Sequence, residues 1–358
     1  MKSHIKYMFA ILMLFAATLR VSAEKEGNDS VSVNNEAGPL FDFFSSDELL
    51  EITLQFNMRE FIKTRMDPYK NFDARLSVST EDNKNLSQDI SLRARGKMRR
   101  KYCTFPPIML KIKKDKDQEQ VFPKGSIKLV THCSSAGSFE NYLLKEYLAY
   151  KLYNLVTPYS FKTRLVAVNY VDSLNPKRTF KEYGILIEDV DDLASRNNAI
   201  VIENLKIGQN HMNDYEMARV AFFNYMIGNT DWSVAEQHNI KVLKIDRATA
   251  DKGIPVTYDF DYSGFVNTSY SSPNEKIPIT NVTERYFQGG CYSDELFRQI
   301  ISEFEDLEPQ LMQTIEDFPY LQKAQKNLAK SYLKSFFKRY KKEDALIADI
   351  NRTCLRRD

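Results

Sequence analysis

The chain has 358 residues, of which 43% are hydrophobic, and it includes 20 Tyr and 23 Phe. This composition excludes an intrinsically disordered protein, and the length allows a large core. The formal net charge is +2; loss of the first 23 residues would remove Lys2, Lys6 and Arg20 and leave −1, so nucleic acid is not an expected partner.

Residues 1–23 are typical of a secretory signal peptide, with a basic start, an apolar run from Met8 to Leu19 and small residues at Ser22 and Ala23. The run is shorter than the ~20 residues of a membrane-spanning helix, and no later segment is both long and uncharged enough to span. We expect a secreted protein, periplasmic or extracellular, that does not span a membrane. Residues 24–40, rich in Asn, Ser and Glu, predict a disordered leader.

Residues 41–190 predict a sheet-rich N-terminal lobe with one long helix. Apolar and polar residues alternate at 50–56, 74–78, 90–94 and 108–112, and a short strand follows at 127–131. The apolar spacing then changes to three and four through residues 139–155, which predicts a helix that ends before Thr157 and Pro158. Strands at 165–171 and 183–187, joined by a turn at 175–178, predict a hairpin.

Residues 191–358 predict a mostly helical C-terminal lobe that carries the catalytic and metal loops. Asn213 and Glu216 form a capping box, and the helix that they begin ends at Gly228. A short strand is expected at 255–258, and residues 293–355 are helical. In the helix expected at residues 323–342, the lysines lie on one face, and Leu328 lies with other apolar residues on a different face. We favour the interpretation in which the lysine face is in solvent and the apolar stripe beneath it packs against the protein. The alternative is that the lysine face binds acidic partners or anionic lipid.

This order of elements predicts an α+β, protein-kinase-like bilobal fold, with an antiparallel-sheet N-lobe and a mostly helical C-lobe. Two loops at 228–239 and 258–261 carry the side chains that such a site needs. Asp231 is the candidate base for an acceptor hydroxyl, and Asn239 and Asp259 are candidate ligands for Mg²⁺ or Mn²⁺. Asp261 is a second carboxylate ligand or a turn cap. The alternative for each is an ordinary Asx turn or helix cap.

A strand lysine paired with a helix glutamate would hold the nucleotide phosphates. Lys128 and Glu146 have the required separation, and the alternative is an exposed lysine beside a surface glutamate. Lys113 replaces Lys128 if Lys128 faces solvent. His238 lacks a Ser or Cys partner, so we interpret it as structural.

Four cysteines follow the predicted signal, and none is spaced as a metal-binding Cys-x-x-Cys pair. Four cysteines allow three pairings, of which Cys103 with Cys133 is favoured because both flank strands of the same predicted lobe. Four unpaired, buried thiols remain the alternative.

The chain resembles the spore-coat CotH family of secreted atypical kinases and, more distantly, HipA-type kinases. The resemblance covers residues 90–265 and rests on segments 93–96, 128–130, 144–150, 184–189, 228–239 and 258–261. It implies ATP-dependent phosphorylation of a protein hydroxyl, with Asp231, Asn239 and Asp259 at the family's loop positions. It also implies that Glu188, Asp189 and Val190 form a hinge that binds adenine. The gap between Asp231 and Asn239 is longer than in HipA-type loops, which weakens the assignment of Asn239.

The sequence therefore predicts a secreted kinase that transfers the γ-phosphate of ATP to a protein or peptide. A binding module of the same shape, holding a peptide, polymer or divalent ion without turnover, is the alternative, since a periplasm contains little ATP. A metal-dependent hydrolase ranks last because the histidines that such sites use are missing.

Overall fold

The computed structural model describes residues 39–80, 84–113, 120–203, 207–245, 252–340 and 342–356. Within the chain, Gly38–Asp358 forms one compact unit. The predicted signal peptide and nearly all of the predicted leader lie outside the described residues.

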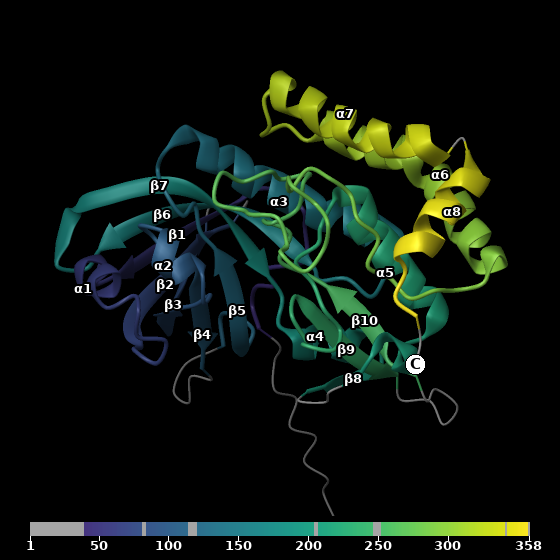
Figure 1. Cartoon of the computed structure of the whole chain (residues 1–358). Helices are drawn as coiled ribbons and strands as arrows, with labels where there is room; N and C mark the ends of the chain where they lie inside the picture. The colour runs from purple at the N-terminus through teal and green to yellow at the C-terminus, as the bar shows by residue number, and fades with distance from the viewer. Residues whose placement is uncertain are drawn as a thin grey trace, which may run out of the picture. The chain divides into compact units, whose positions relative to one another are not determined.

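Seven strands form a closed barrel in the order β1-β2-β3-β4-β5-β7-β6 (Figure 1). Neighbouring strands are antiparallel except β1 and β6, which pair in parallel from Leu50 opposite Val166 to Phe56 opposite Asp172. The strands are β1 (Leu50–Phe56), β2 (Phe72–Ser79), β3 (Asn85–Ala94), β4 (Ile108–Ile112), β5 (Gly125–Val130), β6 (Thr163–Asp172) and β7 (Asn175–Ile187).

The predicted kinase-like bilobal fold, with an open antiparallel N-lobe sheet, is therefore wrong. Every barrel strand overlaps a predicted strand, although β3 and β7 begin earlier than predicted, at Asn85 and Asn175. In addition, β1 uses both of its edges, with β2 on one side and β6 on the other. Alternation of apolar and polar residues shows which face of a strand is buried and carries no information on which strand lies beside it. The parallel closure, between strands more than 100 residues apart, is invisible to that pattern.

A second sheet of three strands, β10-β9-β8, lies in the later part of the chain. Its strands are β8 (Ala199–Ile202), β9 (Ile240–Ile245) and β10 (Ile254–Thr257). The sequence predicted only β10. The predicted turn at 175–178 instead belongs to β7, and residues 258–292 contain no helix or strand, so the later half is less helical than predicted.

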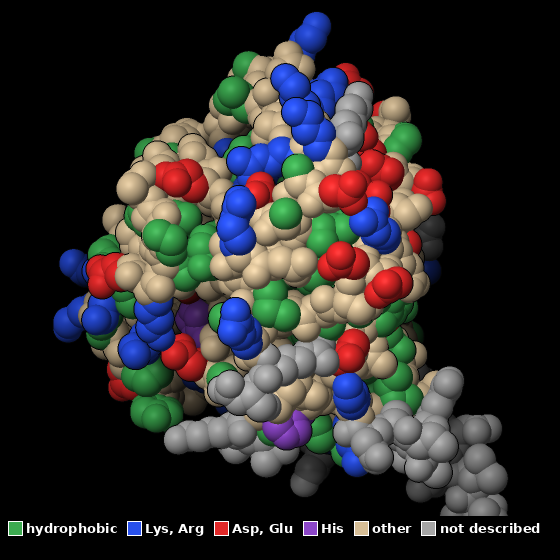
Figure 2. Space-filling model, turned by 45° about the vertical axis from the view of Figure 1, so that its right-hand side comes forward, with side chains coloured by type: hydrophobic (Ala, Val, Ile, Leu, Met, Phe, Trp, Pro, Cys, Tyr) green, Lys and Arg blue, Asp and Glu red, His purple; other side chains and the backbone are tan. Residues whose placement is uncertain are grey.

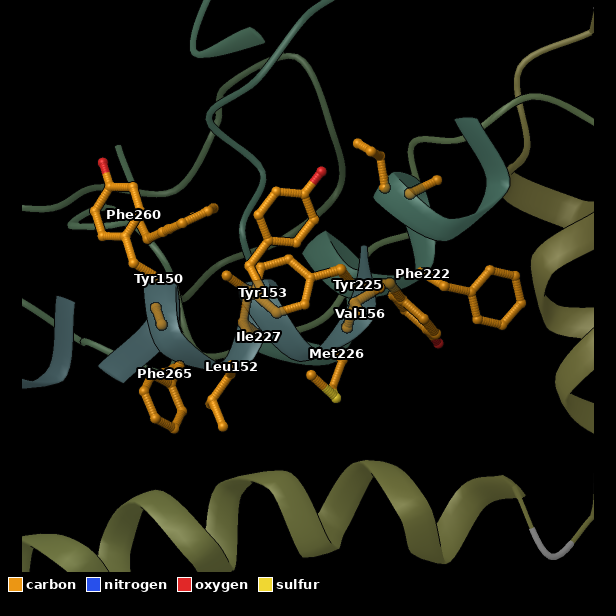
Figure 3. Close-up of a cluster of buried hydrophobic side chains, with 14 of the residues drawn as sticks. Tyr150, Leu152, Tyr153, Val156, Phe222, Tyr225, Met226, Ile227, Phe260 and Phe265 are labelled. Carbon is orange, nitrogen blue, oxygen red and sulfur yellow. The ribbon is translucent and has the colours of Figure 1, made fainter. Parts of the chain in front are cut away.

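Helix α3 (Gly137–Val156) contacts β6 and β7 of the barrel and the helices α5 and α6, so it joins the two halves of the core. Eleven of its residues are buried, which explains why its sequence shows no polar face. Its Tyr150 and Tyr153 rings pack with Phe260 (Figure 3). The Tyr153 ring also packs with Phe223 of α5. The remaining helices are α1 (Met58–Lys63), α2 (Arg99–Tyr102), α4 (Val190–Arg196), the 3₁₀ helix η1 (Gln209–His211), α5 (Asp214–Ile227), α6 (Asp294–Asp317), α7 (Lys323–Tyr340) and α8 (Glu343–Thr353).

Lysines and arginines gather at the top of Figure 2, where α7 lies. Two of the predicted face lysines are engaged with α6, since Lys326 donates to the carbonyl of Glu316 and Lys330 pairs with its carboxylate. Leu328, expected in the apolar stripe, is 62% exposed. Part of this basic face therefore serves packing between α6 and α7, while Lys334 and Lys338 are exposed.

Two disulfides, Cys103–Cys133 and Cys291–Cys354, use all four cysteines. The favoured pairing is confirmed, and the alternative of four free thiols is wrong. None of the described helices combines the length and apolarity needed to cross a bilayer.

Candidate functional site

Asn239 and Asp259 lie at the same end of the β9–β10 pair. Thr257 is opposite Ile240 in the ladder, and the N–H of Tyr258 donates to the carbonyl of Asn239 at 3.0 Å. Asn239 therefore enters β9 where Asp259 leaves β10. This antiparallel pairing brings together two residues that are twenty positions apart.

Both residues have a left-handed backbone, with φ of 51° at Asn239 and 63° at Asp259. Asn and Asp tolerate this conformation better than other side chains with a β-carbon, and such residues gather at functional sites. Asp259 is held there by its N–H, which donates to the Tyr150 hydroxyl at 2.9 Å, and by the buried ring of Phe260.

Asp231 lies in the loop that follows α5. This helix begins as predicted at Asn213, whose side chain accepts from the Glu216 N–H, and it ends at Gly228, where φ is +63°. Its last turn is tied to the loop by Asn229, which donates to the Asn224 side chain at 2.8 Å. The loop geometry is therefore set by a buried helix end.

The Asp231 carboxylate is held by two neighbours. Asn239 Nδ2 donates to Asp231 Oδ2 at 3.0 Å, and His238 Nε2 lies 2.9 Å from Asp231 Oδ1. The hydrogen bond that His238 makes to the Asp231 carboxylate raises the pKa of His238. Because its Nδ2 faces Asp231, the amide oxygen of Asn239 points away from that carboxylate. His238, interpreted as structural from the sequence, thus touches the candidate base.

Lys128 lies on β5 with its ammonium over the rings of Phe161 and Tyr258, at 5.1 and 5.5 Å from their centroids. Burial, aided by the nearby charge of Arg95, lowers the pKa of Lys128 to about 8, while Asp189 and Asp259 oppose that change. Among the described residues, no ion pair or hydrogen bond involves the side chains of Lys128 or Arg95. Two neighbouring cations without a direct ion pair are available to bind an anion such as a phosphate group.

Glu146, the predicted partner of Lys128, pairs instead with Arg99. Arg99 Nη2 lies 2.7 Å from Glu146 Oε2, 2.9 Å from Asp261 Oδ2 and 3.5 Å from Asp259 Oδ1. Burial raises the pKa of Glu146 and of Asp261, and the guanidinium opposes that change in both. The predicted Lys128–Glu146 pair is therefore not formed, because an arginine from a distant turn occupies the position beside Glu146.

Asp261 is held by Arg99 and by the Tyr270 hydroxyl, which donates to Asp261 Oδ2 at 3.0 Å. Only 4% of this residue is exposed, whereas the Asp259 side chain is 36% exposed. Asp259 is thus the accessible carboxylate of the turn.

The predicted hinge follows β7. The Glu188 side chain accepts from the Lys162 N–H and from Arg196, and Asp189 caps α4, so both side chains have local partners. Val190 begins α4. Lys113, the substitute for Lys128, follows β4 and lines a cavity that contains none of the other predicted site residues.

A cavity of about 710 Å³ opens beside Asp231. Asp231, Trp232 and His238 line one side, and Leu355 and Arg356 at the C-terminal end line another, where the Cys291–Cys354 disulfide and a bridge between Gly290 and Leu355 hold them. Lys128, Asn239 and Asp259 do not line this cavity, so it is a space on the Asp231 side of the site.

The described residues contain no group of three or more His, Cys, Asp or Glu side chains able to hold a metal ion. Asn239 and Asp259 offer two oxygen ligands, which suits Mg²⁺ that keeps water and phosphate oxygens, and does not suit an all-protein metal cage. From the sequence, the arginines of the turn that includes Arg95 and Arg99 are either phosphate-binding groups or part of a basic surface hairpin; in the structure Arg99 binds carboxylates. The only sequence signal of these arginines is the basic turn at 93–100.

The sequence matches no known protein-family model, and no curated protein is similar enough to count as a relative. The resemblance to CotH and HipA-type kinases therefore stays a prediction.

Proposed function

We propose that this protein is a metal-dependent phosphotransferase that moves the γ-phosphate of ATP to a hydroxyl of a protein or peptide. The observation that carries the proposal is the position of Asp259. Asp259 follows Tyr258, whose N–H donates to the Asn239 carbonyl at 3.0 Å, and Asn239 Nδ2 donates in turn to Asp231 Oδ2 at 3.0 Å, so the two acidic loops meet at one place.

In this reaction each chain residue has a separate task. Lys128 and Arg95 bind phosphate oxygens, and Asn239 and Asp259 would hold Mg²⁺ or Mn²⁺, which supplies charge neutralisation on the phosphates. Asp231 orients the acceptor hydroxyl and receives its proton as the oxygen bonds to phosphorus and the bond to ADP breaks. The cavity beside Asp231 accommodates the acceptor chain.

A second candidate function is binding without transfer. It is favoured by the Glu146–Arg99 pair, because Lys128 lacks the glutamate that would position it on the phosphates. Secretion by the predicted signal peptide agrees with the two disulfides, and we propose a periplasmic or extracellular location.

The test is phosphate transfer from γ-labelled ATP with Mg²⁺ or Mn²⁺, with the protein itself and dephosphorylated casein as acceptors. Asp259→Asn should reduce labelling by about 100-fold, as loss of one charge-stabilising group does. Asp306→Asn, at an exposed position of α6, is the matched control and should label like wild type. Equal labelling by Asp259→Asn would show that the site is wrong. ATP binding without any transfer would favour the second candidate.

A further inference from the structure

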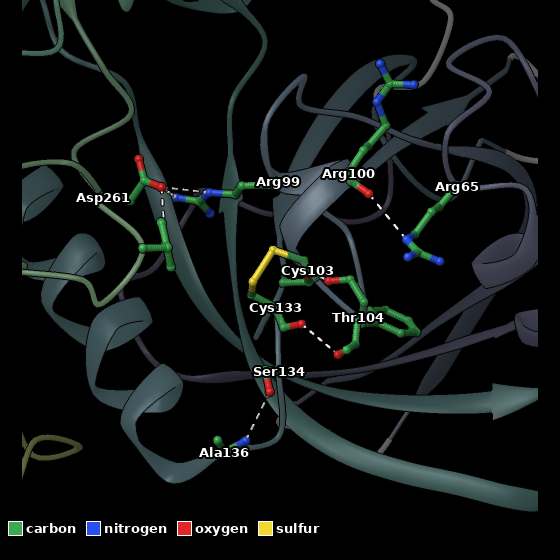
Figure 4. Close-up of a disulfide and its surroundings, with 12 residues drawn as sticks. Arg65, Arg99, Arg100, Cys103, Thr104, Cys133, Ser134, Ala136 and Asp261 are labelled. Carbon is green, nitrogen blue, oxygen red and sulfur yellow. Dashed lines mark hydrogen bonds and ion pairs between the residues drawn. A yellow bond between two sulfur atoms is a disulfide. The ribbon is translucent and has the colours of Figure 1, made fainter. Parts of the chain in front are cut away.

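Arg99 links the Glu146 carboxylate on α3 to the carboxylates of the Asp259 turn. It belongs to α2, and its guanidinium contacts Glu146, 47 residues away, and Asp261, 162 residues away. The side chains of Arg99, Glu146 and Asp261 are 13%, 3% and 6% exposed. Figure 4 shows Arg99 extending from α2 to Asp261.

The helix that carries Arg99 has little packing of its own. Helix α2 has four residues, none of them buried, and its cap residue Met98 makes no side-chain cap hydrogen bond. Such a short helix is not stable alone, so other contacts must hold it in place.

A disulfide supplies one such restraint, beside the hydrogen bonds that join Arg100 to Arg65 and Met66. Cys103 is the C-cap of α2, its N–H donates to the Arg99 carbonyl at 2.8 Å, and its sulfur bonds to Cys133, shortly before α3 begins (Figure 4). The Thr104 hydroxyl and the Phe105 N–H both donate to the carbonyl of Cys133. The disulfide therefore ties the turn that carries Arg99 to the start of the helix that carries Glu146.

We propose that Arg99 is the positioning residue of the phosphotransferase site, held in place by the Cys103–Cys133 disulfide. It fixes Glu146 on α3 and Asp261 in the turn, and so sets the direction of Asp259 between them. Its nearest contact with Asp259 is to Oδ1, so Oδ2 is left for a ligand. Because Arg99 pairs with Glu146, Lys128 is free of that carboxylate and binds phosphate. This inference rests on the proposed function.

The test compares Arg99→Gln, Arg99→Lys and Arg219→Gln. Arg219 also makes a partly buried ion pair, with Glu216, outside the site, so it controls for general loss of stability. Arg99→Gln should lower kcat about 100-fold with the KM for ATP changed less than about threefold, because Lys128 and Arg95 still bind phosphate. Arg99→Lys should recover about tenfold of that loss, and Arg219→Gln should retain the wild-type kcat.

A second measurement needs no nucleotide. Hydrogen exchange of the amides at 258–262 should accelerate about tenfold or more in Arg99→Gln and in the double variant Cys103→Ser/Cys133→Ser, and should stay unchanged in Arg219→Gln. Should Arg99→Gln fail to fold, Arg99→Lys and the double variant carry the test. If kcat and the hydrogen exchange of residues 258–262 were unchanged in the Arg99 variants and the double cysteine variant, this inference would be overturned and the proposed function would stand. A wild-type protein that transfers no phosphate would overturn the proposed function, and the inference with it.

Discussion

Lys128 carries a partly buried positive charge, and the cost of burying that charge should lower the stability of the folded protein. Its folded pKa of about 8 is below the ordinary value of 10.5, so the charged form destabilises the fold below pH 8, and the effect fades as the pH rises toward 10.5. Lys128→Met should therefore stabilise the protein at pH 7 by on the order of 1 kcal/mol, and by less at pH 10. Thermal unfolding at both pH values measures this, with Lys244→Met at an exposed position of β9 as the control. A lower melting temperature at pH 7 would contradict it.

The same lysine should make nucleotide binding depend on pH. An ammonium with a pKa of about 8 loses its charge between pH 7 and 9, so the affinity for ATP should fall over that range. Lys128→Arg, which stays charged, should bind with little change from pH 7 to 9. Calorimetric titration with a non-hydrolysable ATP analogue and Mg²⁺ measures both; a parallel fall in wild type and variant would assign the dependence to another group.

At the scale of single elements, the end of α5 depends on Gly228. Its φ of +63° disfavours any residue with a β-carbon, and a Cβ there would lie 2.1 Å from the Tyr332 hydroxyl. Gly228→Ala should cost about 1–2 kcal/mol of unfolding free energy or more. Gly137→Ala, at the start of α3 with open space around it, should be neutral or slightly stabilising. Urea unfolding compares the two; equal stabilities would show that the turn rearranges.

The C-terminal segment should shape the acceptor cavity. The Cys291–Cys354 disulfide closes a loop of 63 residues and holds Leu355 against the wall at Gly290. The double variant Cys291→Ser/Cys354→Ser should lose about 2–4 kcal/mol of stability and should raise the KM for a peptide acceptor, while the KM for ATP changes little. Steady-state kinetics with each substrate varied in turn separate the effects. A change confined to the KM for ATP would place the acceptor elsewhere.

At the scale of the whole molecule, closure of the barrel gives β1 two hydrogen-bonded edges. Thr53 is opposite Ser77 in β2 and opposite Asn169 in β6. Amide hydrogens on both edges of β1 should therefore exchange as slowly as those of β2. If β1 were an edge strand, every second amide would lack a hydrogen-bond partner and would exchange quickly. Hydrogen exchange resolved by residue is the check. Fast exchange on the β6 side would indicate an open sheet.

The sequence predicted the elements whose signals are local. Alternation placed β1 at its observed residues, and the capping pair and the terminal glycine placed α5. Strand β9 was missed because its Ile240, Val242 and Leu243 are adjacent to charged lysines and follow no simple alternation. The candidate base and ligands could be proposed from the sequence because they are residues of distinctive chemistry at short spacing within two loops, and their roles stay a prediction.

By itself, the sequence determined the strands of the barrel, the long buried helix and the acidic loops, since each depends on residues within a few positions of one another. Only the tertiary structure decided that β1 pairs with β6 and closes the barrel, and that Glu146 forms its ion pair with Arg99 instead of Lys128. It also decided that Asn239 and Asp259 lie together at one end of the β9–β10 pair. These are contacts between segments separated by tens to more than a hundred residues. Which of several compatible partners pairs with a given strand or charge depends on the packing of the whole core, and the pattern of any one segment does not contain that information.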